Sequence, residues 1–119
     1  MNIGDRLINR HINEIESLKT SHSTGLKQVI SAGFGDAMII KQIAVGTLTK
    51  EDIIPTHVHL DMDECYFFLE GEGYMHVNEV AIPLSEGKVI NVPAGASHRL
   101  ECTVSPLRFF YICLEIAKK

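Results

Sequence analysis

The most informative stretch of this sequence is residues 55–73, which read PTHVHLDMDECYFFLEGEG. His57 and His59 stand two positions apart, and residues with this spacing point to the same face of a β-strand. Glu64 follows after four intervening residues, and His98 lies further along the chain. Three neutral imidazoles and one carboxylate suit Fe(II), Mn, Ni, Co, Zn or Cu better than Ca or Mg. The pattern therefore indicates that these four side chains can share one divalent transition metal.

The identity of the carboxylate ligand is left open by strand periodicity. On an unbroken strand, Asp61 and Asp63 would share the face of the two histidines, whereas Glu64 would point to the opposite face. A turn or bulge must reset the register if Glu64 is the ligand. The residues alone do not choose between these carboxylates.

From Pro55 to Cys102 the sequence resembles the cupin superfamily, which has two motifs. The first has the form H-x-H, three or four residues, E, six residues, G, and it is matched by His57, His59, Glu64 and Gly71. The second has the form G, five residues, P-x-G, two residues, H, three residues, N, and it is matched by Gly87, Pro93, Gly95 and His98. The sequence departs from the family pattern at two positions. Glu51 stands where the family has a glycine six residues before the first histidine, and Cys102 stands where the second motif ends in asparagine.

The resemblance implies both a fold and a metal site. The fold is an all-β, double-stranded β-helix (a jelly roll or cupin barrel), which we expect to occupy residues 1–119 as a single domain with its barrel over about 26–116. The resemblance also implies a metal site formed by His57, His59, Glu64 and His98. The ion would be Fe, Mn, Ni, Co or Zn. This ligand set accepts several first-row metals, and cellular supply decides among them.

The pattern of apolar residues predicts one helix followed by strands. Ile8, Ile12, Ile15 and Leu18 recur at spacings of four, three and three, which is typical of an amphipathic helix, here over about 4–18. Beyond a polar turn, short runs rich in Val, Ile, Phe and Tyr end at Gly, Pro, Asn or Asp. We expect strands near 26–31, 37–47, 55–60, 64–70, 73–78, 80–83, 88–92, 97–103 and 107–116.

Several other side chains are candidates for the site or its surroundings. Tyr66 and Phe68 share the parity of Glu64, so they are expected to line the same pocket, with Tyr66 as the candidate catalytic group that donates a hydrogen bond or exchanges a proton. Cys102 is expected to be a buried structural thiol. The remaining candidates are placed outside the site, as loop carboxylates or as packed or solvated histidines: Asp61, Asp63, His11, His22 and His76.

Composition excludes several classes of protein. The chain has 119 residues, 45% of them hydrophobic and 22% charged, which is typical of one packed domain. Its net charge of −4 disfavours a nucleic-acid partner. No apolar run reaches the roughly 18 residues of a membrane span. The three cysteines (Cys65, Cys102 and Cys113) lack C-x-x-C spacing, which favours reduced thiols and a cytoplasmic location.

Two functions follow, from different classes. The first is a metal-dependent enzyme that acts on a small organic molecule, as a dioxygenase, isomerase or decarboxylase. The alternative is a non-catalytic barrel that binds a sugar or another metabolite, or that is purely structural. The final predicted strand, residues 107–116, is apolar on both faces, so we expect its outer face to be covered and the protein to form a homodimer.

Overall fold

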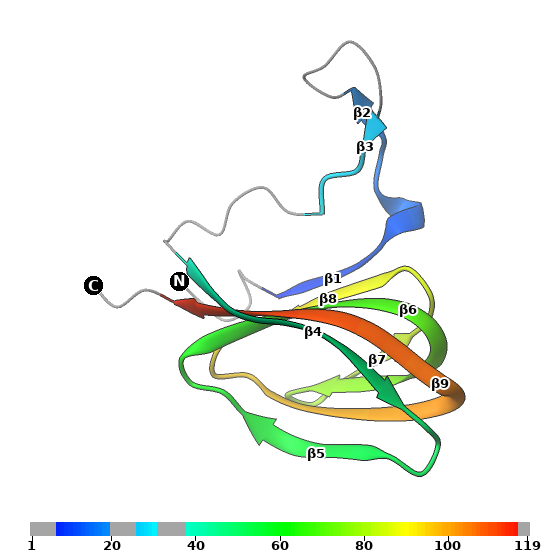
Figure 1. The fold of residues 1–119 in the computed structure, drawn as a ribbon, viewed down its shortest axis with the longest axis vertical. Helices are drawn as coiled ribbons and strands as arrows, with labels where there is room; N and C mark the ends of the chain where they lie inside the picture. Colours follow the sequence, from blue (N-terminus) through cyan, green and yellow to red (C-terminus); the bar gives the residue numbers. More distant parts are fainter. Residues whose placement is uncertain (1–6, 20–25, 31–37, 117–119) are drawn as a thin grey trace.

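The computed structural model describes residues 7–19, 26–30 and 38–116 and is built almost entirely from strands (Figure 1). The elements are β1 (Ile8–His11), the short 3₁₀ helix η1 (Ile12–Glu14), β2 (Leu18–Lys19), β3 (Leu26–Lys27), β4 (Met38–Leu48), β5 (Ile53–Val58), β6 (Met62–Val77), β7 (Val80–Leu84), β8 (Lys88–Val92) and β9 (Ser97–Ile116). All strand pairs are antiparallel.

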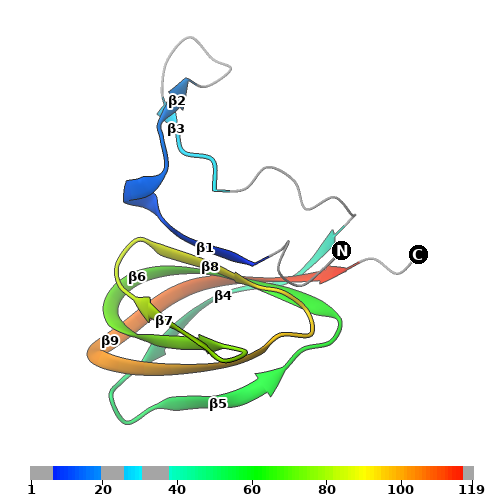
Figure 2. The same ribbon diagram turned by 180° about the vertical axis from the view of Figure 1, so that it is seen from behind.

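Two long strands organise the barrel. β6 has 16 residues and β9 has 20, and they pair with each other over most of their length. The first half of β6 and the second half of β9 are flanked by β8 and β4, whereas their other halves are flanked by β7 and β5. Figures 1 and 2 show both strands bending round, so that the halves face each other as two layers. This is the expected all-β jelly roll.

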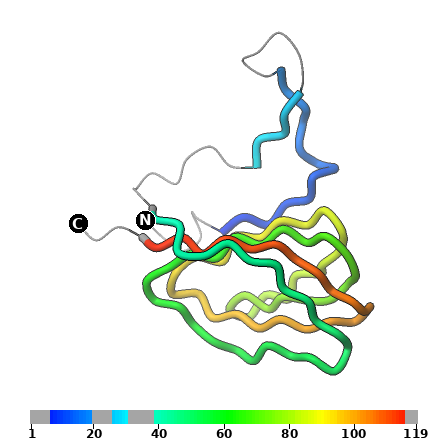
Figure 3. Tube along the Cα trace, viewed as in Figure 1, coloured from blue at the N-terminus to red at the C-terminus, as the bar shows by residue number. Residues whose placement is uncertain are grey.

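The bend in β6 is located at Gly71. The pairing of β6 with β9 shifts register three times between Phe68 and Gly73. Gly71 has φ +85°, a conformation that strains L side chains, and a Cβ built there would lie 2.1 Å from the carbonyl oxygen of Pro106. Glycine therefore allows the backbones of the two paired strands to approach closely where they bend. The bends of both strands are seen in the trace of Figure 3.

The core fills the space between the two layers. Inward-facing residues alternate along β6 and β9, as the strand period of two requires. Phe68, Met75, Leu100 and Leu107 are at most 1% exposed. Two buried polar residues, Glu64 and His98, line the same interior beside the core residues Leu100 and Phe109. The site and the core therefore share one interior.

The predicted helix over about 4–18 is wrong in its described part, residues 7–18. This segment forms β1 and η1 instead, and β1 pairs along the edge of β8 with Ile8 opposite Asn91. Ile8, Ile12 and Ile15 still turn toward the protein, and Ile15 is buried. Isoleucine is a poor helix former, and β8 offers unpaired backbone groups, so tertiary pairing overrides the helical spacing.

Other predicted strands need smaller corrections. Residues 64–70 and 73–78 merge into β6, and 97–103 and 107–116 merge into β9, because a bent strand continues through each predicted break. The strand predicted at 26–31 is only Leu26–Lys27, which pairs with β2 in a separate two-stranded sheet. The long barrel strands therefore begin at β4.

Candidate metal centre

Two of the three histidines lie in the paired strands β5 and β9, and the third directly follows β5. His57 lies in β5 directly opposite His98 in β9, with ring centroids 4.1 Å apart. Pro55 lies within a register shift of β5 between Ile54 and His57, and a proline cannot donate a ladder hydrogen bond. His59 follows the end of β5 at Val58. The strand pairing thus brings the two sequence motifs together.

Glu64 joins them from β6 because the chain turns between the two strands. β5 ends at Val58 and β6 begins at Met62, so residues 59–61 reset the register that an unbroken strand would have kept. Glu64 is 6% exposed and Asp61 is exposed. The carboxylate question left by strand periodicity is therefore resolved by this turn: Glu64 faces the histidines.

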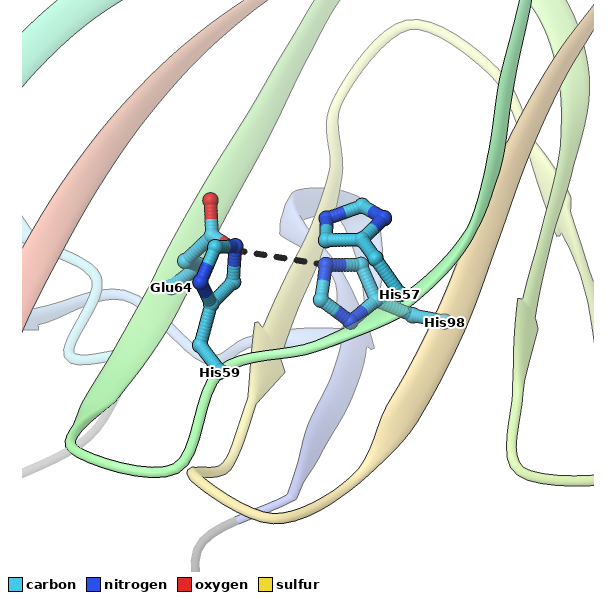
Figure 4. A group of neighbouring side chains, drawn as sticks. All are labelled: His57, His59, Glu64 and His98. Carbon is cyan, nitrogen blue, oxygen red and sulfur yellow. Dashed lines mark ion pairs between the residues drawn. The ribbon is translucent and has the colours of Figure 1, made fainter.

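The four side chains point at one another, as Figure 4 shows. Each offers one ligand atom, and these atoms all lie within 4.8 Å of one another. Glu64 Oε1 is 3.1 Å from His59 Nε2 and 3.2 Å from His98 Nε2. One carboxylate oxygen therefore lies close to two imidazole nitrogens.

Backbone carbonyls orient two of the imidazoles. His57 Nδ1 lies 2.8 Å from the carbonyl oxygen of Pro55, and His98 Nδ1 lies 3.4 Å from that of Ala96. A carbonyl oxygen only accepts, so each Nδ1 must carry a hydrogen and donate it. In the neutral rings the lone pair is then on Nε2, which is the arrangement found in metal-binding histidines.

Two buried atoms at the centre fit a cation. His98 Nε2 and Glu64 Oε1 face each other, and neither forms a hydrogen bond with any residue that the structure describes. With His98 neutral, both atoms are acceptors, and buried acceptors without a partner are unfavourable by several kcal/mol at most sites. A transition-metal ion bound by the four side chains would satisfy both atoms, so the residues present fit such an ion.

The second oxygen of Glu64 is held separately. The Tyr66 hydroxyl donates to Oε2 at 3.1 Å, and Cys113 Sγ lies 3.9 Å from the same oxygen. Burial raises the pKa of Glu64, but a hydrogen bond and positive charge from His98, positive charge on His59 and the Tyr66 hydroxyl outweigh it and leave the pKa below its ordinary value, and a cation bound at the same place would act in the same direction. Glu64 is thus an ionised group whose Oε1 faces the histidines.

Tyr66 itself is a buried donor. Burial, followed by the neighbouring Glu64 carboxylate, raises the pKa of Tyr66 far above the ordinary tyrosine value. The hydroxyl therefore stays protonated at physiological pH and donates to Glu64. Burial, and then Glu64, likewise raise the pKa of the Cys113 thiol. Tyr66 and Cys113 therefore both keep their protons and donate them toward Glu64 Oε2.

A cavity of about 310 Å³ opens beside these residues. Its walls come from β4, β5, β6 and β9. Three predicted metal ligands and Tyr66 reach it, whereas Phe68 is packed in the core. The lining residues are Gly46, Thr47, Leu48, Ile54, His57, Glu64, Tyr66, His98, Leu100, Phe109 and Tyr111.

Asp63 has a role that sequence reasoning missed. It was expected to be a loop carboxylate, but it lies in β6 and is fully buried. Its Oδ1 accepts from Ala94 N at 2.8 Å and its Oδ2 accepts from Asn91 Nδ2 at 3.2 Å. Gly95 N also donates to the His59 carbonyl oxygen at 2.8 Å. These bonds fix the turn that leads into His98.

Cys113 was also missed as a neighbour of the site. It lies opposite Glu64 in the pairing of β6 with β9, a contact between residues far apart in the sequence. No local spacing signals such a pair. For Asp63 a signal existed in the sequence. If Glu64 faces the histidines, the adjacent Asp63 must point to the opposite face of the strand.

The other candidates lie outside the cluster. His76 is half-buried and its Nε2 is 3.1 Å from Glu101 Oε1. His11 is half-buried instead of exposed, with Nε2 2.6 Å from the Glu86 carbonyl oxygen. His22 lies outside the described residues. Cys102 is buried within the hydrophobic core, as expected.

The bent antiparallel sheet and its cluster of three histidines and one glutamate define a β-barrel protein with a candidate metal site inside the barrel. A family model for the cupin domain matches residues 44–113. This match spans more than half of the 119 residues, so the chain belongs to the cupin family.

Solved structures agree with this assignment. The chain is 28% identical to a predicted oxalate decarboxylase from Thermotoga maritima, with a TM-score of 0.62 over 65% of this chain and 68% of that chain. A conserved protein of unknown function from Streptococcus pyogenes is 21% identical, with a TM-score of 0.59 over 87% and 96%. Salicylate 1,2-dioxygenase from Pseudoaminobacter salicylatoxidans is 16% identical, with a TM-score of 0.56 over 70% and 26%. The last two likenesses concern the fold alone.

Two further comparisons gave negative results. No curated protein is significantly similar to this chain. Among the described residues, no helix is long and apolar enough to cross a membrane.

Proposed function

We propose that this cupin is a metal-dependent enzyme that acts on a small organic molecule in the barrel cavity. His57, His59, Glu64 and His98 would hold a divalent transition metal. The observation that carries the proposal is the pair Glu64 Oε1 and His98 Nε2, buried 3.2 Å apart without hydrogen-bond partners among the described residues. With neutral imidazoles, a barrel without a metal would leave these two buried acceptors face to face without a partner.

The bound ion would supply Lewis acidity or, if redox-active, access to oxygen chemistry. The chain's own residues have separate tasks. Glu64 is kept ionised mainly by His98 and His59, and the Tyr66 hydroxyl orients its Oε2. We assign Tyr66 the role of a hydrogen-bond donor at the cavity wall instead of a general base, because its raised pKa keeps the proton on the phenol.

The reaction class is supported by the similar structures only in outline. One of them, 28% identical, is described as a predicted oxalate decarboxylase. Decarboxylase chemistry is therefore one candidate, and dioxygenase and isomerase chemistry are the others, because a metal with open coordination positions can support each of them.

One observation favours the alternative, a barrel that binds a sugar or another metabolite without turnover. Among the described residues lining the cavity, the ionisable groups other than the predicted ligands are two tyrosines, Tyr66 and Tyr111. General acid–base catalysis needs a group whose pKa lies near the working pH, and Tyr66 is far from it. Oxygen uptake or product formation with candidate substrates separates the enzyme from the binder.

Metal content tests the metal site on which the proposed enzyme depends. We expect protein purified without added metal to contain about one equivalent of a transition metal by elemental analysis. His57→Ala and His98→Ala should lose it. His76→Ala is the matched control, because this histidine lies outside the cluster and pairs with Glu101. Unchanged metal content in His57→Ala would remove the basis of the proposal.

We also propose a homodimer in the cytoplasm. The outer face of β4 carries Ile43 and Val45, more than half exposed, opposite Ile112 and Phe110 of β9. A contiguous apolar face of this kind suits a second copy of the chain. Light scattering should give twice the chain mass of 13.2 kDa, and Ile43→Lys should shift it toward the monomer. A monomeric wild-type protein would contradict the dimer. The cytoplasmic location is supported by three free thiols.

A further inference from the structure

The cavity beyond the metal cluster is bounded by apolar side chains. Leu100 and Phe109 are at most 3% exposed, and Leu48, Ile54 and Tyr111 pack against the same core. A volume of about 310 Å³ lies at the lower end of the roughly 300–1,000 Å³ that ligand pockets span. A ligand here must be compact, and the surface that it presents away from the metal cluster must tolerate hydrocarbon.

The walls provide no countercharge for a second anion. None of the described lining residues is lysine or arginine, and the only carboxylate among them is Glu64. A charged group placed among Leu48, Ile54 and Leu100 would lose its hydration without gaining a partner. One anionic group can be accommodated at the metal cluster, whereas a second one at the far end would find no cation among the described lining residues.

The aromatic wall is preformed. The rings of Tyr66, Phe109 and Tyr111 are neighbours, with centroid distances of 5.6, 5.7 and 5.9 Å. Behind Phe109 lies Gly46, where a Cβ would be 2.4 Å from the ring carbon Cζ. The ring therefore lies directly on the β4 backbone, and no side chain separates the two. A flat or branched apolar group can pack on this wall without rearrangement.

We infer that the ligand is a small monoanion with a chelating head group and an apolar body, such as an aryl or branched alkyl group. The inference deepens the proposed function and rests on it, since the head group is assigned to the metal cluster. It excludes compact dianions and phosphorylated sugars as preferred ligands of this cavity.

Three 2-oxo acids test the inference because they share one head group and differ in the body. Pyruvate carries a methyl group, phenylpyruvate a benzyl group, and 2-oxoglutarate a second carboxylate. Calorimetric titration of the Ni(II)-loaded protein compares their affinities, and the contribution of the common head group cancels. We expect phenylpyruvate to bind about tenfold to a hundredfold more tightly than pyruvate, the value of burying one aromatic side chain. We expect 2-oxoglutarate to bind no more tightly than pyruvate.

A charge placed in the wall should reverse the preference. Leu48→Arg puts a guanidinium at a half-buried lining position, so 2-oxoglutarate should gain affinity and phenylpyruvate should lose it. Val80→Arg is the matched control, because Val80 is 60% exposed on β7 and does not line the cavity. Circular dichroism checks that both variants are folded. If either variant does not fold, the comparison of the three ligands on the wild-type protein still tests the inference.

The outcomes separate the two proposals. Stoichiometric nickel binding with 2-oxoglutarate preferred, or with no gain from the benzyl group, would overturn the apolar-body inference and leave the metal site intact. Failure of the protein to bind nickel or any other tested transition metal would overturn the metal-dependent function, and this inference with it.

Discussion

Replacing Asp63 with alanine probes how the site is held in place. Asp63 is fully buried and accepts hydrogen bonds from Ala94 N at 2.8 Å and from Asn91 Nδ2 at 3.2 Å. Hydrogen bonds to a charged acceptor contribute roughly 1.5–3 kcal/mol each, and removing a buried charge returns part of its desolvation penalty. We therefore expect Asp63→Ala to lower the free energy of unfolding by about 3 kcal/mol.

Urea denaturation of the metal-free protein, followed by far-UV circular dichroism, measures this loss. A domain of ordinary stability, about 5–15 kcal/mol, remains folded after it. Metal affinity should also fall, because the turn that Asp63 anchors leads directly into His98. Asp61→Ala is the matched control, since Asp61 is exposed and should change stability by less than about 0.5 kcal/mol. Equal stabilities of the two variants would refute the reasoning.

Four further predictions concern the pH dependence of stability, the pH dependence of metal binding, the hydrogen bond to the Glu64 carboxylate and the corner of the barrel. The lowered pKa of Glu64 stabilises the metal-free fold above the ordinary carboxyl pKa of 4.5, and this stability is lost as pH falls through the folded-state value, so Glu64→Gln should flatten the dependence of the urea midpoint between pH 6 and 3. Bound metal should dissociate as pH falls toward about 5, measured by dialysis and elemental analysis, because imidazole ligands must be unprotonated; full retention would indicate other ligands. Tyr66→Phe removes a donor to Glu64 Oε2 and should weaken metal affinity about tenfold in calorimetry, and unchanged affinity would argue against a positioning role. Gly71→Ala should lower the free energy of unfolding by about 1–3 kcal/mol or more, measured by urea denaturation. A neutral effect would contradict the strain at φ +85°.

The electrostatic design of the site rests on hydrogens that point away from its centre. His57 and His98 donate to backbone carbonyls, and Tyr66 donates to the outer oxygen of Glu64. Each bond leaves an acceptor facing inward. A cluster that collects acceptors in a buried space is suited to a cation, and the surrounding hydrocarbon strengthens that preference because it excludes water.

Local sequence was sufficient to predict most of the barrel strands and the ligand candidates. Alternation places His57 and His59 on one face, and the turn residues Pro93–Gly95 precede His98 at a short, readable distance. These features depend on backbone geometry within a few residues. They could therefore be predicted without knowing which strands pair.

Local sequence was insufficient wherever the structure of a residue depends on pairing or contact with a segment far away in the chain. The spacing of Ile8, Ile12 and Ile15 suits a helix, but the open edge of β8 pairs with this segment as a strand. The choice of Glu64 over Asp63 depends on a turn and on the strands that then surround each side chain. Cys113 reaches Glu64 only through the register of β6 with β9.

The physical reason for this division is the range of the interactions involved. Side-chain direction, turn conformation and strand propensity arise within a few residues, so the sequence alone indicated the strand-rich class and the three histidine candidates, and only its resemblance to the cupin superfamily singled out Glu64. Burial and strand pairing join residues far apart in the sequence, so only the tertiary structure decided how the N-terminal segment folds, which carboxylate faces the histidines and how apolar the cavity walls are.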